Sequence, residues 1–185
     1  MAPKKLFFIL VLAAISAFSF PVLAQDKGAA KPPDNKPPNM TLPTKSPELS
    51  TISVKALTGQ VATLGAVVSG KKPTMLVFWA SWCPDCKAET PAVKAVYDSY
   101  APKGLNVIGI STAGKDTVDM VKAYVQENGL KYPVYYDSIK AAAKAYGITW
   151  IPTVILLDKT GKVVYKGPKV SVPAIEALLA GKPIP

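Results

Sequence analysis

The sequence FWASWCPDCK occupies residues 78–87 and contains both cysteines of the chain, Cys83 and Cys86. It begins inside a continuous apolar run, residues 74–79, of the kind found in strands that are covered on both faces. The residues after Cys83 show helical periodicity, and Pro84 suits a first helical turn because an N–H group there has no partner within the helix. The two cysteines are therefore predicted to lie where a buried strand is followed by a helix.

Two cysteines at this spacing and place favour redox chemistry. Their sulfurs lie close enough to form a disulfide, and the amides and dipole of a helix N-terminus stabilise a thiolate. The sequence predicts that Cys83 is the more exposed residue and the attacking thiolate, whereas Cys86 resolves the mixed disulfide. A purely structural disulfide is disfavoured because so small a loop gives little entropic stabilisation. A zinc site is disfavoured because the chain has no other Cys and no His.

The composition excludes several classes of enzyme. The chain has 185 residues with 22 Lys, 12 Asp or Glu, no Arg and no His, for a formal net charge of +10. Ser-His-Asp and Cys-His nucleophiles, His-ligated metals and Arg clamps on phosphate are therefore impossible. A nucleic-acid binder is expected to gather Arg and aromatic residues, so the lysines are interpreted as a solvated surface. We expect no metal, no cofactor and no nucleic-acid partner.

Residues 1–24 have the plan of a secretory signal. Lys4 and Lys5 precede an apolar stretch that closes with small residues and predicts cleavage after Ala24. The alternative is an uncleaved membrane anchor, because the apolar stretch approaches the spanning length of about 20 residues; only in that case is contact with the membrane expected. Either way, the folded domain is predicted to lie outside the cytoplasm, in a bacterial periplasm or cell envelope.

A tether and one folded domain are predicted after the signal. Residues 25–50 contain six of the 18 prolines and few large apolar side chains, which is typical of a disordered, extended spacer. Residues 51–185 are of normal size for one hydrophobic core.

Within this domain the sequence predicts an α/β fold. Strands that alternate with helices, and that end in a hairpin and a helix, imply a mixed central sheet with helices on both faces. Asp116 is a possible cap of one helix and Gly129 a stop. The predicted strands cover residues 52–56, 61–64, 74–79, 105–110, 153–157 and 163–165, and the predicted helices cover 84–99, 116–128, 138–146 and a last segment that opens at 171–173.

Residues 78–91 resemble the active-site stretch of thioredoxin-like proteins and are most similar to the extracytoplasmic TlpA/ResA branch. The resemblance covers about 51–185 and is clearest again at 146–148, 151–153 and 156–161. It implies a thioredoxin fold with an N-terminal β-hairpin and a helix–strand insertion at about 115–136. It also implies thiol–disulfide exchange and a cis-proline, Pro152, beside the disulfide.

The resemblance assigns further site residues. Trp82, Pro84, Ile151 and Pro152 are expected to contact the substrate, whereas Trp79 is interpreted as a core residue. Where thioredoxin itself has a buried acid, six residues before the first cysteine, this chain has Val77.

Glu89 matches a buried glutamate of the branch. A carboxylate sealed near the disulfide has a raised pKa and can exchange a proton with Cys86. The alternative interpretation of Glu89 is a solvated helix residue.

The direction of electron flow is predicted to be reductive. Asp85 lies between the cysteines, where its charge disfavours the thiolate and lowers the reduction potential, and no His is present. We expect a monomer that reduces disulfide-bearing exported proteins and is recharged by a thiol protein of the membrane. Members dedicated to cytochrome c usually have Glu after the cis-proline, whereas Thr153 occupies that position here. The alternatives are a thiol oxidase or isomerase, and a peroxiredoxin-type peroxidase, which is disfavoured by Ala80 and by the absence of Arg.

Overall fold

The computed structural model describes residues 42, 46–68, 71–112 and 114–185. The predicted signal at 1–24 and most of the predicted tether therefore lie outside the described residues. The elements, in chain order, are η1 (Leu49–Thr51), β1 (Ser53–Ala56), β2 (Val61–Thr63), α1 (Leu64–Val67), β3 (Thr74–Trp79), α2 (Pro84–Tyr100), β4 (Asn106–Thr112), α3 (Val118–Glu127), β5 (Val134–Asp137), α4 (Ala141–Ala145), β6 (Thr153–Leu157), β7 (Val163–Gly167) and α5 (Val172–Leu179).

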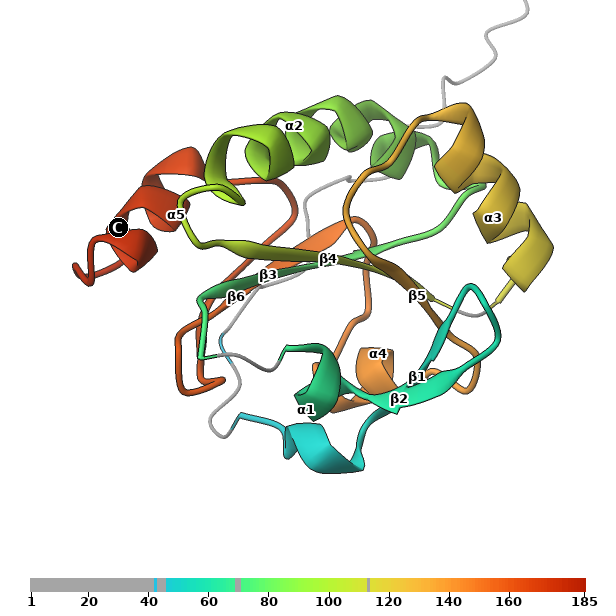
Figure 1. The fold of residues 1–185 in the computed structure, drawn as a ribbon, viewed down its shortest axis with the longest axis horizontal. Coiled ribbons are helices and arrows are strands. Elements are labelled where there is room, and N and C mark those ends of the chain that lie inside the picture. Colours follow the sequence, from blue (N-terminus) through green and yellow to red (C-terminus); the bar gives the residue numbers. More distant parts are fainter. Residues whose placement is uncertain (1–41, 43–45, 69–70, 113) are drawn as a thin grey trace, which may run out of the picture. The chain divides into compact units, whose positions relative to one another are not determined.

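The strands form one sheet in the order β2-β1-β5-β4-β3-β6-β7. β3, β4 and β5 are parallel to one another, whereas β6 pairs antiparallel with β3 and β1 pairs antiparallel with β5. The two antiparallel hairpins, β1–β2 and β6–β7, flank the parallel centre (Figure 1). This arrangement places the carboxyl ends of β3 and β4 side by side, next to the start of α2.

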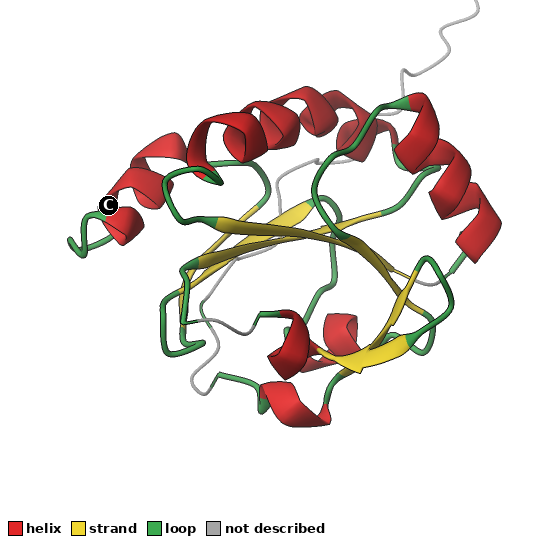
Figure 2. Cartoon of the chain, in the orientation of Figure 1, coloured by secondary structure: helices red, strands yellow, loops and turns green. Residues whose placement is uncertain are grey.

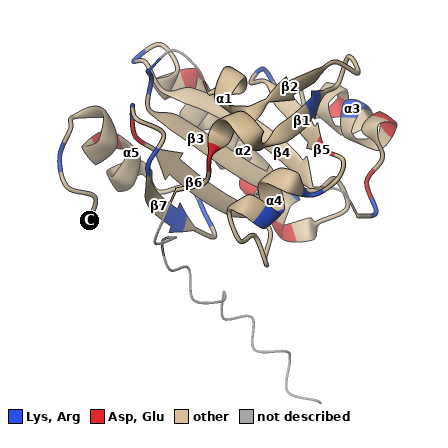
Figure 3. Ribbon diagram, turned by 90° about the horizontal axis from the view of Figure 1, so that it is seen from below, with Lys and Arg blue, Asp and Glu red and all other residues tan. Residues whose placement is uncertain are grey.

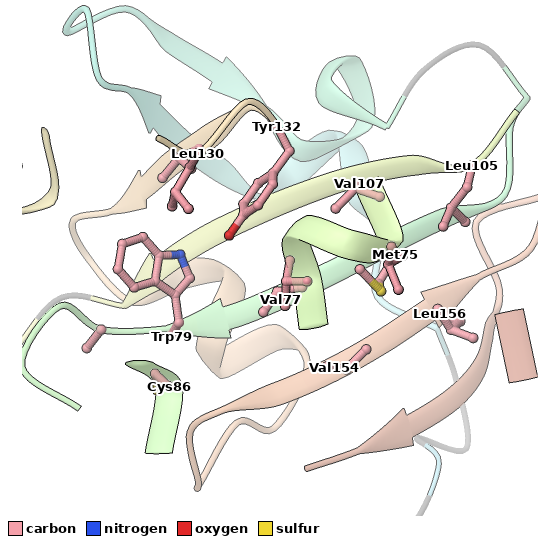
Figure 4. Close-up of a cluster of buried hydrophobic side chains, with 14 of the residues drawn as sticks. Met75, Val77, Trp79, Cys86, Leu105, Val107, Leu130, Tyr132, Val154 and Leu156 are labelled. Atoms are coloured by element: carbon pink, nitrogen blue, oxygen red, sulfur yellow. The ribbon is translucent and has the colours of Figure 1, made fainter. Parts of the chain in front are cut away.

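Helices cover both faces of the sheet (Figures 1 and 2). β3 is buried along its whole length, and its side chains alternate between two hydrophobic clusters. Met75, Val77 and Trp79 belong to the cluster beneath α2, α3 and α5, part of which is shown in Figure 4. Leu76 and Phe78 belong to the cluster on the face of α1 and α4. The continuous apolar run is thus explained by burial on both faces.

The thioredoxin fold, the mixed sheet, the N-terminal hairpin and the helix–strand insertion are confirmed. Two short elements, η1 and α1, are not in the sequence prediction, because three or four residues are too few to show a helical period. Ordered structure also begins before residue 51: Leu49 packs against the second cluster, and the Ser46 hydroxyl accepts a hydrogen bond from Val163 N at 3.0 Å.

The cap of α3 differs from the prediction. Thr117, not Asp116, is the N-cap, and its hydroxyl accepts a hydrogen bond from Met120 N at 3.2 Å. Within the described part of the chain, no helix is long and apolar enough to cross a membrane.

Candidate active site

Cys83 and Cys86 form a disulfide at the N-terminus of α2, with their Cα atoms 5.2 Å apart. Cys83 is the N-cap of the helix, and its Sγ accepts a hydrogen bond from Cys86 N at 3.2 Å. Pro84 occupies the first turn, as predicted, and Asp85 is the acidic residue of that turn. In the reduced protein, the same amide and the helix dipole would stabilise a thiolate at Cys83.

Exposure does not distinguish the two cysteines in the oxidised state. Cys83 is 5% exposed and Cys86 is 4% exposed, so the prediction of a clearly more exposed Cys83 is not supported. The surroundings of the two differ instead. Trp82 and Pro84, on either side of Cys83, are both exposed, the former by 43%. Both cysteines belong to the cluster beneath α2, but both chain neighbours of Cys86, Asp85 and Lys87, are charged, and Figure 4 places Cys86 beside the end of β3.

The segment before β6 lies against the disulfide. The Ile151–Pro152 peptide bond is cis, as the resemblance implies. The Ile151 carbonyl oxygen lies 3.8 Å from the Cys83 Sγ. Ile151 is half-buried and Pro152 is buried. The fold therefore brings Ile151 beside Cys83, although 68 residues separate them in the sequence.

Glu89 is half-buried rather than sealed in the core. Its Oε1 accepts a hydrogen bond from Val170 N at 2.7 Å, in the loop before α5. Burial raises the pKa of Tyr165, a hydrogen bond with Ser171 opposes this rise, and the charge of Glu89 adds to it. Glu89 thus ties α2 to the C-terminal part of the fold, a contact that no sequence pattern indicates.

The sequence indicates Asp116 only as a possible helix cap, and its contact with the loop before Cys83 was missed. Asp116 is 4% exposed and accepts hydrogen bonds from Ser81 N at 2.9 Å, from the Ser81 hydroxyl and from the Ser111 hydroxyl at 2.9 Å. Its own carbonyl accepts a hydrogen bond from the Tyr136 hydroxyl at 2.9 Å. Asp116 therefore joins the loop before Cys83 to the ends of β4 and β5.

Cys86 is also linked to α3 through polar side chains. The Thr90 hydroxyl donates to the Cys86 carbonyl at 3.0 Å and lies 2.8 Å from the Tyr124 hydroxyl. The Tyr124 ring packs against Trp79 with centroids 4.9 Å apart. Trp79 is 5% exposed, which confirms its interpretation as a core residue.

The sequence matches the Redoxin family over residues 33–179. The chain belongs to the Redoxin family. The thiol-disulfide oxidoreductase ResA of Bacillus anthracis is 38% identical to this chain over 93 residues, which are 50% of this chain and 53% of that protein. The sporulation thiol-disulfide oxidoreductase A of Bacillus subtilis is 32% identical over 91 residues, 49% of this chain and 55% of that protein. The chain therefore spans about half the length of these relatives.

Solved structures agree with this family membership. An uncharacterized conserved protein from Geobacillus kaustophilus has a TM-score of 0.68 at 25% identity, covering 79% of this chain and 86% of that one. StoA from Bacillus subtilis has a TM-score of 0.56 at 25% identity, covering 69% of this chain and 91% of that one. Together with the ResA likeness, these findings identify a thioredoxin-like protein of the TlpA/ResA type.

The described residues contain no group of three or more His, Cys, Asp or Glu side chains that could hold a metal ion.

Proposed function

We propose that this protein is a thiol–disulfide oxidoreductase that reduces disulfides of exported proteins. The position of the Cys83 sulfur carries the proposal. Cys83 is the N-cap of α2, its Sγ accepts a hydrogen bond from Cys86 N, and the Ile151 carbonyl lies beside it. A sulfur in this position is held where a thiolate is stabilised, next to exposed residues that a substrate can contact.

The reaction transfers two electrons in two exchange steps. The Cys83 thiolate attacks one sulfur of the target disulfide, and the other target sulfur leaves as a thiolate that takes up a proton. The Cys86 thiolate then attacks the Cys83 Sγ, which closes the disulfide at the helix N-terminus and releases the second target sulfur. The protein is oxidised, and the target gains two thiols.

Glu89 is proposed to take the proton of Cys86 before the second step. It lies three residues after Cys86 on α2, so both side chains project toward the same side of the helix. Val170 N donates to Oε1, and among the described residues the other carboxylate oxygen has no hydrogen-bond donor, so it can accept a proton. This role rests on position and chemistry, since a carboxylate within reach of a thiol is a competent base.

Trp82, Pro84, Ile151 and Pro152 are proposed to contact the substrate. Trp82 is 43% exposed, whereas Trp79, at the end of β3, is in the core. An exposed aromatic ring next to a reactive sulfur offers contact area to a docking chain at little entropic loss.

The proposed direction is reduction, because Asp85 disfavours the thiolate and no His is present to favour it. An exported reductase needs renewed thiols, since the extracytoplasmic space keeps cysteines oxidised. We therefore include a membrane thiol protein as donor, a secretory signal at 1–24, and a periplasmic or cell-envelope location in the proposal.

Reduction of insulin disulfides tests the function. With a small dithiol as donor, the protein is expected to accelerate insulin precipitation, and Cys83→Ser is expected to abolish the effect. Peroxide consumption by the same preparation is expected to stay at background, because peroxidases of this fold use a Thr or Ser where Ala80 lies and an Arg that the chain lacks. Peroxide turnover without insulin reduction would overturn the proposal.

A further inference from the structure

A groove of about 280 Å³ lies beside the disulfide. Trp82 forms one wall, and the segment Ile148–Ile151 forms another. Both walls lie next to the reactive sulfur. Trp82 directly precedes Cys83 in the sequence, and the Ile151 carbonyl oxygen lies 3.8 Å from the Cys83 Sγ. An extended chain advances about 3.3 Å per residue. The side chains next to a target cysteine are therefore the ones that can reach this groove.

The groove is cationic. Its lining includes Lys115 and Lys140 and no acidic residue. The Lys115 Nζ lies 5.3 Å from the centre of the Trp82 ring, which holds its charge over the aromatic wall. Lys140 is at the N-cap of α4, with φ 56° and no side-chain capping hydrogen bond.

Among the described residues, neither lysine forms an ion pair with a carboxylate. In the described part of the chain, ion pairs are found only at Lys122–Asp119 and Lys131–Asp98. Asp116, next to Lys115 in the sequence, directs its carboxylate inward to Ser81 and Ser111. Elsewhere along the chain, Lys and acidic positions occur on the same elements, as on α3 (Figure 3). The groove thus carries two lysines that form no ion pair among the described residues, and the nearby Asp137 carboxylate is held inward by Ala142 N and Ala143 N.

We propose that this groove selects target segments that carry an acidic side chain next to the reactive cysteine. The inference rests on the proposed function and adds a substrate preference to it. The apolar and aromatic walls pack against the extended segment, and the two ammonium groups attract the carboxylate as it approaches. Exposed ion pairs of this kind add little to binding at equilibrium, but they speed encounter and they weaken with salt.

Six peptides that share one sequence test the preference. Each has a single cysteine joined by a disulfide to thionitrobenzoate, with Asp, Asn or Lys either just before or just after the cysteine. Attack of Cys83 on the peptide sulfur breaks the disulfide and releases coloured thionitrobenzoate, so that the absorbance gives the rate. Rates with β-mercaptoethanol correct for the intrinsic reactivity of each peptide.

At low salt, the Asp peptide of at least one set is expected to react about tenfold faster than its Lys counterpart, with Asn between them. The difference is expected to shrink severalfold in 1 M NaCl, where the Debye length is about 3 Å. The salt comparison uses the wild-type protein alone, so it holds even if a variant misfolds.

Paired variants locate the effect. K115Q/K140Q is expected to reduce the Asp-to-Lys ratio to below about threefold. The control K159Q/K182Q removes the same charge from two exposed lysines. Lys159, in the β6–β7 turn, and Lys182 line one cavity beside the amino end of β3, away from the disulfide. The control is expected to leave the ratio unchanged.

The possible failures are distinct. Equal rates for all peptides, or a ratio that the control lowers as much as K115Q/K140Q does, would refute the groove assignment while leaving the reductase function intact. Failure of the folded wild-type protein to react with any peptide would refute the proposed function itself.

Discussion

Ser81 and Asp116 are joined by two hydrogen bonds, one from the Ser81 amide at 2.9 Å and one from its hydroxyl, although 35 residues separate them in the sequence. Ser81 lies two residues before Cys83, and Asp116 lies between β4 and α3. The third donor, the Ser111 hydroxyl, comes from the end of β4. The buried carboxylate therefore fixes the loop that enters the redox helix against the neighbouring strand.

Replacing Asp116 is predicted to destabilise the fold. Asp116→Ala leaves the Ser81 N–H and the Ser81 and Ser111 hydroxyls without their acceptor, and unsatisfied buried donors cost about 1–3 kcal/mol each. We expect a loss of about 3 kcal/mol or more in the free energy of unfolding, measured by urea denaturation. Asp116→Asn retains one acceptor oxygen and is expected to lose about 1–2 kcal/mol. The control, Asp119→Asn, alters an exposed side chain and is expected to stay within about 0.5 kcal/mol.

Cys83 is predicted to react before Cys86 in the reduced protein. The Cys86 amide and the N-terminus of α2 stabilise negative charge at the Cys83 sulfur, so its pKa is expected to be the lower of the two. Alkylation at graded pH followed by mass spectrometry measures this order. Cys86→Ser is expected to trap the mixed disulfide with a substrate, whereas Cys83→Ser is not. Preferential labelling of Cys86 would reverse the roles assigned here.

Glu89→Gln is predicted to slow thiol–disulfide exchange without unfolding the protein. Glutamine still offers an Oε1 acceptor to Val170 N, so the substitution removes the charge and the proton acceptor while retaining the contact. We expect a rate loss of about tenfold or more and a shifted cysteine titration, with little change in urea midpoint. Glu176→Gln is the matched control, because Glu176 is also a helical carboxylate in a hydrogen bond, to the Tyr100 hydroxyl. An unchanged rate and titration in Glu89→Gln would reduce Glu89 to a structural contact.

The reduction potential is predicted to lie nearer about −270 mV, the value for thioredoxin, than about −120 mV, the value for the oxidant DsbA. Asp85 between the cysteines opposes the thiolate, and the absence of His removes a group that would stabilise it. Equilibration with dithiothreitol or glutathione, followed by the fluorescence of exposed Trp82, measures the potential. A potential above about −160 mV would indicate an oxidase or isomerase instead.

Stability is predicted to fall in alkaline solution because of buried tyrosines. Burial raises the pKa of Tyr146, and burial together with Tyr124 raises that of Tyr132. In the unfolded chain these phenols ionise near pH 10, whereas in the folded protein they stay neutral to a higher pH. The stability contribution is therefore complete below pH 10 and is lost as pH rises above it, by up to about 1.4 kcal/mol per pH unit for each phenol.

Tyr146→Phe tests this reasoning. The Tyr146 hydroxyl is buried without a hydrogen-bond partner among the described residues, and its ring packs against Phe78. Removing the hydroxyl is expected to leave stability at pH 7 unchanged or to raise it by about 1 kcal/mol, and to make the alkaline loss shallower. Urea denaturation between pH 8 and pH 11 checks both. A loss of more than about 1 kcal/mol in the free energy of unfolding at pH 7 would indicate that the hydroxyl has a hydrogen-bond partner.

The sequence by itself determined the fold class and the reactive pair. The apolar run 74–79, the cysteines three apart and Pro84 are neighbours in the chain, so local periodicity and helix-terminus chemistry suffice to place a disulfide after a buried strand. The same holds for the two hairpins, whose turns and alternating residues are also local.

Only the tertiary structure decided which remote groups surround the sulfurs. The sequence predicts Asp116 as a possible helix cap, yet Thr117 is the N-cap of α3 and the Asp116 carboxylate accepts a hydrogen bond from Ser81 N. Glu89 is expected from the resemblance to be sealed near the disulfide, yet it is half-buried and the loop before α5 brings Val170 N against it. These contacts join residues 35 and 81 positions apart in the sequence, and they are stabilised by burial and hydrogen bonding between segments that the fold brings together. A local sequence pattern records no such partner, because the partner is determined by the packing of the whole sheet.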